Sequence, residues 1–228
     1  MTNKRIILSL VIPCYNESSN LELLVPRCRK IVKENDIEVI FVNNGSTDTT
    51  ATTLEELCKE NDKMQIVELE RNQGYGGGII KGLEHSKGLF VSWTHADMQT
   101  DPEDIVYALK KLKENKMKEN IFLKGKRLKR PLKDNFFTVA MSIFETFLLK
   151  QPLWDINAQP TVFSKSFYLS WDDPPTDFSL DLFAYYLARK LGLKIIRIPV
   201  FFKKRAFGES HWNVDFSAKK KFILRTLQ

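Results

Sequence analysis

The chain has 228 residues, a length that suits one large α/β domain or two small ones. Its 43% of apolar and 11% of aromatic residues are enough for a packed core, which excludes a disordered or low-complexity protein. The net charge of +7 and the pI near 9.2 indicate an anionic partner such as a nucleotide diphosphate, a lipid phosphate, a membrane surface or a nucleic acid.

The chain opens with a short apolar run, Ile6–Ile12, that leads into Pro13 to Glu17. The run is too short for a signal peptide and has no small-residue cleavage site after it, so we expect a first buried strand. No stretch is long and apolar enough to span a bilayer, so any membrane contact is expected to be peripheral.

Strand-like and helix-like segments alternate through the first half. The predicted strands are Ile6–Ile12, Glu38–Val42, Gln65–Leu69 and Leu89–Trp93. The predicted helices are Asn20–Lys33, Thr49–Glu60, Ile79–His85 and a segment from Asp101 to about Lys113. Repeated βα alternation predicts a Rossmann-like, mostly parallel sheet with helices on both faces. Ligands of such sheets bind at the carboxyl ends of the strands.

The second half is less regular. Predicted strands are Ile121–Leu123, Thr161–Phe163 and Ile195–Phe202, and predicted helices are Phe136–Leu149, Phe178–Lys190 and the basic amphipathic tail Asp215–Gln228. Pro199 lies inside the last strand, which suggests an edge strand or a bend. There is no internal repeat or linker, so residues 1–228 are predicted to form one domain.

Polar side chains follow the run Leu89–Trp93 at alternating positions: His95, Asp97 and Gln99. On an extended backbone, alternate residues point the same way, so the three could face one cleft and hold a divalent cation. The alternative is a polar loop that only closes a strand.

Three motifs follow predicted strands: Val11–Glu17, Val42–Asp48 and His95–Gln99. This ordered set resembles a family 2 glycosyltransferase with a GT-A fold, and within it the dolichol- or polyprenyl-phosphate mannosyltransferase-like branch. Further matches are Arg71–Gly76, Gly125–Arg127 and Arg205–Ser210. The resemblance implies an inverting hexosyltransferase, with a nucleotide-sugar-binding half at 1–115 and an acceptor-binding half, including the basic C-terminal helix, at 116–228.

The resemblance also implies a nucleotide-sugar site. Its predicted residues are Pro13, Tyr15, Glu17, Asn44, Asp48 and Arg205. Tyr15 would lie against the ribose or base while Glu17 accepts hydrogen bonds, although a simple Pro-Tyr turn is an alternative. Asp48 could instead cap the following helix. Asn43 and Asn44 stand where relatives commonly carry acids, so the base is not predicted.

A metal site is implied by the match of His95–Gln99 to an Asp-x-Asp-x-Gln pattern in which His95 replaces the first acid. The predicted ligands are His95, Asp97 and Gln99, and imidazole favours Mn²⁺ at least as much as Mg²⁺. The cation would offset charge on the leaving diphosphate. The alternative for His95 is a strand-end histidine beside the metal.

The glycine-rich segment Asn72–Gly78 is predicted as a loop before a helix. It does not follow a first strand, so a dinucleotide fingerprint is rejected. Two interpretations remain: a loop near the nucleotide, with Lys81 one turn inside the helix, or a purely structural loop.

The acceptor side is expected to use Arg127 against a phosphate, with Lys124 and other bases around it. A solvated basic loop, Lys124–Lys133, is the alternative; nucleic acid is excluded because no stacking aromatics are interleaved. The resemblance implies that Asp181 is an acid that faces the acceptor. It would act as a general base for a hydroxyl acceptor and would matter less for a phosphate. The alternative is a charge that only stabilises the start of a helix. The predicted catalytic residues are thus Asp97, Asp181 and Arg127.

The chain departs from the resemblance at two places, one at the acceptor (Asp155–Pro160) and one in the motif that closes over the diphosphate in relatives (His211). Asp155–Pro160 stands where those relatives show Asp-x-x-Ser-Gly-Phe-Arg, and His211 replaces a usual lysine. A polyprenyl phosphate is the first choice of acceptor. The alternatives are a hydroxyl of a surface glycan, or a nucleotide-sugar-binding protein without transfer activity.

The predicted location is the cytoplasm, at the inner face of a membrane. Three scattered cysteines, Cys14, Cys28 and Cys58, indicate reduced thiols. The basic segment Lys219–Arg225 could rest on anionic lipid, or the tail could be an ordinary packed helix. The oligomeric state is not predicted.

Overall fold

The computed structural model describes residues 5–59, 61–128, 146 and 148–203. Seven strands form one sheet in the order β3-β2-β1-β4-β6-β5-β7. They are β1 (Leu8–Cys14), β2 (Ile37–Asn44), β3 (Met64–Leu69), β4 (Phe90–Trp93), β5 (Ile121–Leu128), β6 (Thr161–Ser164) and β7 (Lys194–Phe201). Only β6 runs antiparallel to its neighbours, β4 and β5. The predicted mostly parallel sheet is confirmed.

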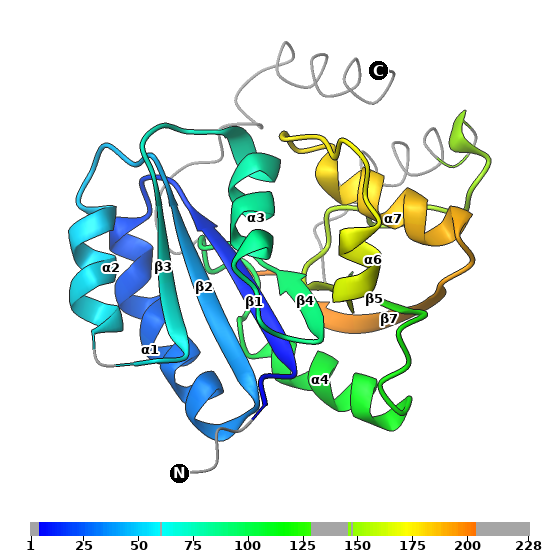
Figure 1. Ribbon diagram of the computed structural model, residues 1–228, viewed down its shortest axis with the longest axis horizontal. Coiled ribbons are helices and arrows are strands. Elements are labelled where there is room, and N and C mark those ends of the chain that lie inside the picture. Colours follow the sequence, from blue (N-terminus) through cyan, green and yellow to red (C-terminus); the bar gives the residue numbers. More distant parts are fainter. Residues whose placement is uncertain (1–4, 60, 129–145, 147, 204–228) are drawn as a thin grey trace.

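Helices cover both faces of this sheet, as predicted (Figure 1). They are α1 (Ser18–Glu34), α2 (Thr50–Cys58), α3 (Gly74–Glu84), α4 (Asp104–Glu114), α6 (Lys165–Leu169) and α7 (Leu180–Lys190). Apolar residues of α1, α2 and α4 pack on one face, and those of α3, α6 and α7 pack on the other. Because both faces are covered, β2 is buried along its whole length.

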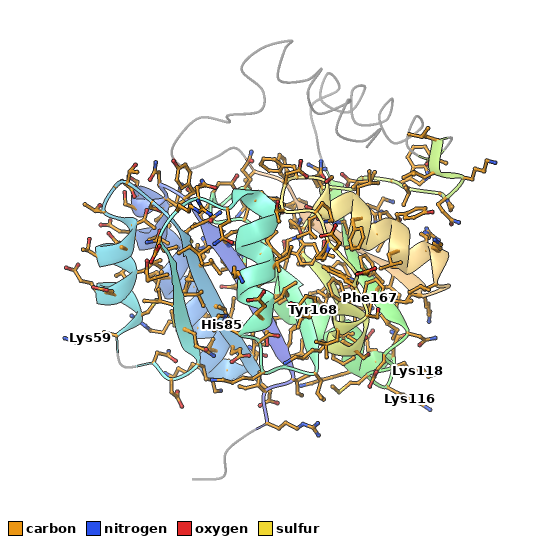
Figure 2. All side chains as sticks on the ribbon, turned by 45° about the horizontal axis from the view of Figure 1, so that its top comes forward. Lys59, His85, Lys116, Lys118, Phe167 and Tyr168 are labelled. Carbon is orange, nitrogen blue, oxygen red and sulfur yellow. The ribbon has the colours of Figure 1, made fainter. Side chains whose placement is uncertain are left out.

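The second half differs most from the sequence-based expectation. Strand β5 continues to Leu128, five residues beyond the predicted end, because it pairs with β7 along its full length. Helix α6 was not predicted. Its Phe167 packs edge-on against the rings of Phe122 and Phe163, and Figure 2 shows it beside Tyr168. The predicted tail helix, and most of the predicted helix Phe136–Leu149, lie outside the described residues.

Pro199 lies in β7, which is an edge strand, as its presence in a strand predicted. The loops after β1, β2 and β3 lie together at the top of Figure 1. Since β1 to β4 are mutually parallel, their carboxyl ends form one edge of the sheet, which we call the carboxyl edge. Among the described helices, none combines the length and apolarity that crossing a membrane requires.

Candidate functional site

The loops after β1 and β2 are joined by the side chain of Asn16. Its Oδ1 accepts a hydrogen bond from the Thr47 backbone N–H at 2.8 Å, and its own N–H donates to Ser46 Oγ at 3.1 Å. Asn16 has φ of 55°, a conformation that asparagine adopts more readily than most residues. Beside it, Tyr15 is 42% exposed at the carboxyl edge. The two loops therefore form one surface from which Tyr15 projects.

Asp48 has local partners that match the helix-start interpretation. Its Oδ1 accepts from the Thr50 backbone N–H at 2.9 Å, and its Oδ2 accepts from the Ser18 N–H at 3.4 Å. Partial burial works to raise the pKa of Asp48, but these hydrogen bonds outweigh it and lower the pKa. Glu17 accepts from Asn20 Nδ2 at 2.5 Å and donates its backbone N–H to Thr50 Oγ1. Asp48 and Glu17 thus connect the starts of α1 and α2.

Asn43 and Asn44 are buried, and each uses both ends of its amide. Asn43 donates from Nδ2 to Glu68 Oε2 at 2.6 Å and accepts from the Ser46 N–H. Asn44 donates from Nδ2 to the Gly74 carbonyl at 2.9 Å and accepts from the Gln73 N–H at 2.9 Å. Asn44 was predicted to contact the nucleotide. Its side chain holds the start of α3 in this structure, and the contact with the nucleotide stays a prediction.

The glycine-rich segment is not a loop, which corrects the prediction. Gly74 to Gly78 form the first turns of α3, and Gly74, Gly76 and Gly77 pack against residues 175–177. The Gly77 N–H donates to the Thr176 carbonyl at 2.8 Å, and a Cβ on Gly76 would collide with two carbonyls of that segment. Lys81 lies in the last turn, where it pairs with Glu84 at 3.0 Å. These contacts fit the structural interpretation, and the placement near the nucleotide stays a prediction.

The predicted extended backbone from His95 to Gln99 is wrong. Strand β4 ends at Trp93, and residues 96–100 are bent. Met98 has φ of 59°, and the Gln99 backbone N–H donates to Asp97 Oδ1 at 3.1 Å. A hydrogen bond between the Thr94 and Thr100 hydroxyls at 3.1 Å closes the bend. His95, Asp97 and Gln99 therefore do not alternate along an extended strand, as the sequence had suggested.

His95 and Asp97 still lie near each other after the bend, and both are residue types that can ligate a cation. Asp97 is only 5% exposed, and its carboxylate lies close enough to His95 to affect the imidazole. Burial lowers the pKa of His95 more than Asp97 and Asp181 raise it, so the ring is neutral, the form that binds metals. Within the described residues, no group of three His, Cys, Asp or Glu side chains could hold a metal alone. A cation held by His95 and Asp97 would need further ligands, such as Gln99 or the substrate.

A buried polar network lies behind His95. The ring of Tyr75 packs against His95, with centroids 5.6 Å apart, and the Tyr75 hydroxyl donates to Asp181 Oδ2 at 3.0 Å. Asp181 Oδ1 accepts from Lys124 Nζ and from Gln159 Nε2, each at 2.8 Å. Lys124 also donates to Thr161 Oγ1 at 2.6 Å. Tyr75 belongs to α3, Lys124 to β5, Thr161 to β6 and Asp181 to α7, and Gln159 lies two residues before β6. The network therefore joins the two halves of the chain.

The charges in this network are fully enclosed. Lys124 is 0% exposed and Asp181 is 2% exposed. Burial alone would raise the pKa of Asp181, but the Lys124 ammonium outweighs it and holds that pKa below its usual range. Lys124 is therefore not part of a solvated basic loop, and Asp181 is an anion with three donors.

Arg127 lies at the end of β5 and is fixed by Asp155. Its backbone N–H donates to Asp155 Oδ2 and its Nε donates to Oδ1, both at 2.7 Å. The guanidinium stacks over the Phe202 ring at 5.2 Å. Arg197 of β7 lies beside it, with Nη2 at 3.8 Å from Asp155 Oδ2. One carboxylate thus positions two arginines, leaving this corner with net positive charge.

The described structure brings together several of the predicted residues. Asp97, Asp181 and Arg127 each lie near enough to His95 for their charges to affect its pKa. Arg205 and His211 lie outside the described residues, as do Lys129 to Lys133 and the basic tail. His85 lies at the far end of α3, away from the carboxyl edge (Figure 2).

Sequence reasoning missed Tyr75, Gln159 and the pairing of Lys124. One signal was available: Lys124 ends the apolar run Ile121–Leu123, and Asp181 lies between two leucines of a predicted helix. Charges inside apolar patterns are expected to be buried and paired.

Residues 9–156 match the family model described as glycosyl transferase family 2. The chain belongs to this family. The family 2 assignment covers the carboxyl edge, the bend after β4 and the Arg127–Asp155 pair.

Two relatives illustrate the kind of family 2 protein that this chain resembles. Dolichyl-phosphate beta-glucosyltransferase of Saccharomyces cerevisiae is 31% identical over 121 residues, 48% of this chain and 36% of that protein. Undecaprenyl-phosphate 4-deoxy-4-formamido-L-arabinose transferase of Enterobacter is 27% identical over 220 residues, 90% of this chain and 62% of that protein. The chain thus spans about a third of the first relative's length.

Solved structures agree in fold. Glucosyl-3-phosphoglycerate synthase from Mycobacterium tuberculosis, in complex with Mn²⁺ and UDP, has a TM-score of 0.71 at 18% identity, covering 97% of this chain and 78% of that one. Mannosyltransferase PcManGT from Pyrobaculum calidifontis, in complex with GDP-Man and Mn²⁺, has a TM-score of 0.68 at 18% identity, covering 98% and 64%. The predicted GT-A fold is confirmed.

Proposed function

We propose that the protein is an inverting glycosyltransferase that moves a hexose from a nucleoside diphosphate sugar to an anionic acceptor, a polyprenyl phosphate. Family 2 membership supports the transfer, and the two relatives named after lipid phosphates support the acceptor class. The observation that supports a phosphate over a hydroxyl acceptor is that Asp181 is buried and already accepts hydrogen bonds from protein donors.

Asp181 is a poor general base in this fold. It is buried, it already accepts from Lys124, Gln159 and Tyr75, and its pKa is lowered. A hydroxyl acceptor needs a group that takes its proton as the new bond forms. A phosphate monoester is already an anion and needs no base, so it is the acceptor that this site suits.

Arg127 and Arg197 suit that acceptor too. Asp155 orients Arg127 through its Nε, and among the described residues the other guanidinium N–H groups donate no hydrogen bond, so they lie in a fixed plane that matches a phosphate. Trp154, which is 47% exposed and whose carbonyl accepts from Arg197, puts apolar surface next to this charge. An apolar chain with a phosphate head matches both features.

In the proposed reaction, an acceptor phosphate oxygen attacks the anomeric carbon from the face opposite the diphosphate. The new carbon–oxygen bond forms while the bond to the diphosphate breaks, and the nucleoside diphosphate leaves with the electron pair. His95 and Asp97, with Gln99, would hold Mn²⁺ or Mg²⁺, and such an ion, when bound, offsets charge on the leaving diphosphate. Pro13, Tyr15, Glu17 and Asp48 would line the nucleotide side.

The test compares acceptors that differ only in the phosphate. Radiolabelled GDP- and UDP-sugars are incubated with the protein, Mn²⁺ or Mg²⁺, and either a short polyprenyl phosphate or the matching polyprenol. We expect the radiolabelled sugar to appear only on the polyprenyl phosphate. NMR of the product should show an inverted anomeric configuration. Transfer to the polyprenol instead would refute the proposed acceptor.

A further inference from the structure

A hollow of about 440 Å³ lies at the outer end of the carboxyl edge, beside β3. It is lined by Glu68, Leu69, Glu70, Arg71 and Gln73. We propose that this hollow takes the base of the donor nucleotide, that the base is guanine, and that Glu68 selects it. The inference rests on the proposed function, because it names the donor of the same site.

The order of the strands gives the distance between the end of β4 and the hollow beside β3. Along the carboxyl edge, Asp97 follows β4 and Tyr15 follows β1, whereas Asn43 lies in β2 and Glu68 lies in β3. Neighbouring strands are about 4.8 Å apart, so the hollow lies roughly 14 Å from the end of β4. That is about the span of an extended nucleoside diphosphate. With the diphosphate at Asp97, the ribose falls near Tyr15 and the base reaches the hollow.

The Glu68 carboxylate is held in place. Asn43 and Glu68 are register partners on β2 and β3, and Asn43 Nδ2 donates to Glu68 Oε2 at 2.6 Å. An acid at position 43 would repel Glu68, whereas an amide anchors it. Each carboxylate oxygen has two lone pairs, so both oxygens of Glu68 can still accept hydrogen bonds.

The rest of the hollow also presents charge. Among the described residues, the side chains of Glu70 and Arg71 form no hydrogen bond or ion pair. Two carboxylates that line one hollow disfavour a ligand edge made of acceptor atoms and favour one that carries hydrogen-bond donors. The ligand edge that enters this hollow must therefore carry N–H groups, with acceptors placed for Arg71.

Guanine is the base with that pattern. Its N1–H and its 2-amino group lie side by side and match the two oxygens of one carboxylate, while O6 and N7 can accept from an arginine. Uracil has one N–H between two carbonyl oxygens, which a carboxylate would repel. Adenine and cytosine place an acceptor nitrogen next to the amino group. Only guanine offers Glu68 two adjacent donors.

The test is calorimetric binding of GDP, IDP and UDP with Mn²⁺. IDP is GDP without the 2-amino group, and UDP carries the same diphosphate. We expect GDP to bind about tenfold or more tightly than IDP or UDP, since a two-donor match is worth about that much against the wrong base. In Glu68→Gln the GDP-to-IDP ratio should fall to near one, with UDP binding unchanged.

Two matched variants sharpen the result. Glu70→Gln removes a charge from the same hollow and should retain the GDP-to-IDP ratio. Glu34→Gln removes an exposed charge at the end of α1, on the opposite side of the sheet, and should alter nothing. Circular dichroism and melting temperatures confirm folding.

Tighter UDP binding, or a Glu68→Gln variant that keeps the ratio, would overturn the guanine assignment. Loss of the ratio in Glu70→Gln instead would overturn the role of Glu68. Those outcomes leave sugar transfer intact, whereas a folded protein that binds no nucleotide diphosphate would overturn the proposed function as well.

Discussion

Lys124 Nζ lies 2.8 Å from Asp181 Oδ1, and both side chains are enclosed by protein. This pair joins β5 of the sheet to α7 above it, and Tyr75 extends the contact to α3 and to His95. An ion pair at this depth stabilises the fold only as a pair, because either charge alone would remain buried without its partner.

We therefore expect Lys124→Met to destabilise the protein by about 3–5 kcal/mol, the effect typical of removing one partner of a buried pair. The double variant Lys124→Met with Asp181→Leu should recover much of that loss, since no charge is left unpaired. Urea unfolding of both variants measures this. Equal stability of the single variant and the unchanged protein would contradict a buried ion pair.

Asp97 is expected to be the most sensitive carboxylate for transfer. Asp97→Ala should lower kcat at least about a hundredfold, because the charge on the leaving diphosphate would lose several kcal/mol of stabilisation. Asp172→Ala, which removes an exposed carboxylate, serves as the control. Transfer rates at saturating donor decide the matter, and full activity in Asp97→Ala would refute the metal site.

His95 should set the choice of cation. His95→Asp replaces a nitrogen ligand by an oxygen, so we expect the ratio of Mg²⁺-supported to Mn²⁺-supported activity to rise. Metal titrations of the transfer rate with each ion measure the ratio. An unchanged ratio, with activity retained, would mean that His95 does not contact the cation.

Arg127 should act on the acceptor. Arg127→Ala is expected to raise the acceptor KM about tenfold or more, the loss typical of a charged hydrogen bond, with a smaller effect on the donor KM. Lys110→Ala on the outside of α4 is the control. A raised donor KM with an unchanged acceptor KM would move Arg127 to the nucleotide side.

Asp104 predicts a pH dependence of stability. Burial, and then repulsion from Asp101, raise its pKa from 3.8 to about 6. A raised pKa in the folded state means that stability falls as the pH rises through that range. Asp104→Asn should thus stabilise the protein at pH 7 by about 1 kcal/mol after allowance for solvent screening, and by nothing below about pH 4. Melting temperatures at both pH values test this.

The sequence alone determined the fold class and the family, because both depend on local patterns. Apolar runs and helical spacing located six of the seven strands to within two or three residues, and polar motifs after β1, β2 and β4 pointed to the carboxyl edge. Pro199 indicated an edge strand, since its ring lacks the N–H that a central strand needs.

Tertiary structure decided what the site residues touch. The bend after β4 ended the alternation of His95, Asp97 and Gln99, because Met98 adopts a positive φ that no spacing rule contains. The roles of Asn44, Lys124 and Asp181 depend on partners 29 to 57 positions away in the sequence, namely Gln73 for Asn44 and each other for the ion pair. Burial makes those partners obligatory, and burial is a property of the packed sheet and helices rather than of any local segment.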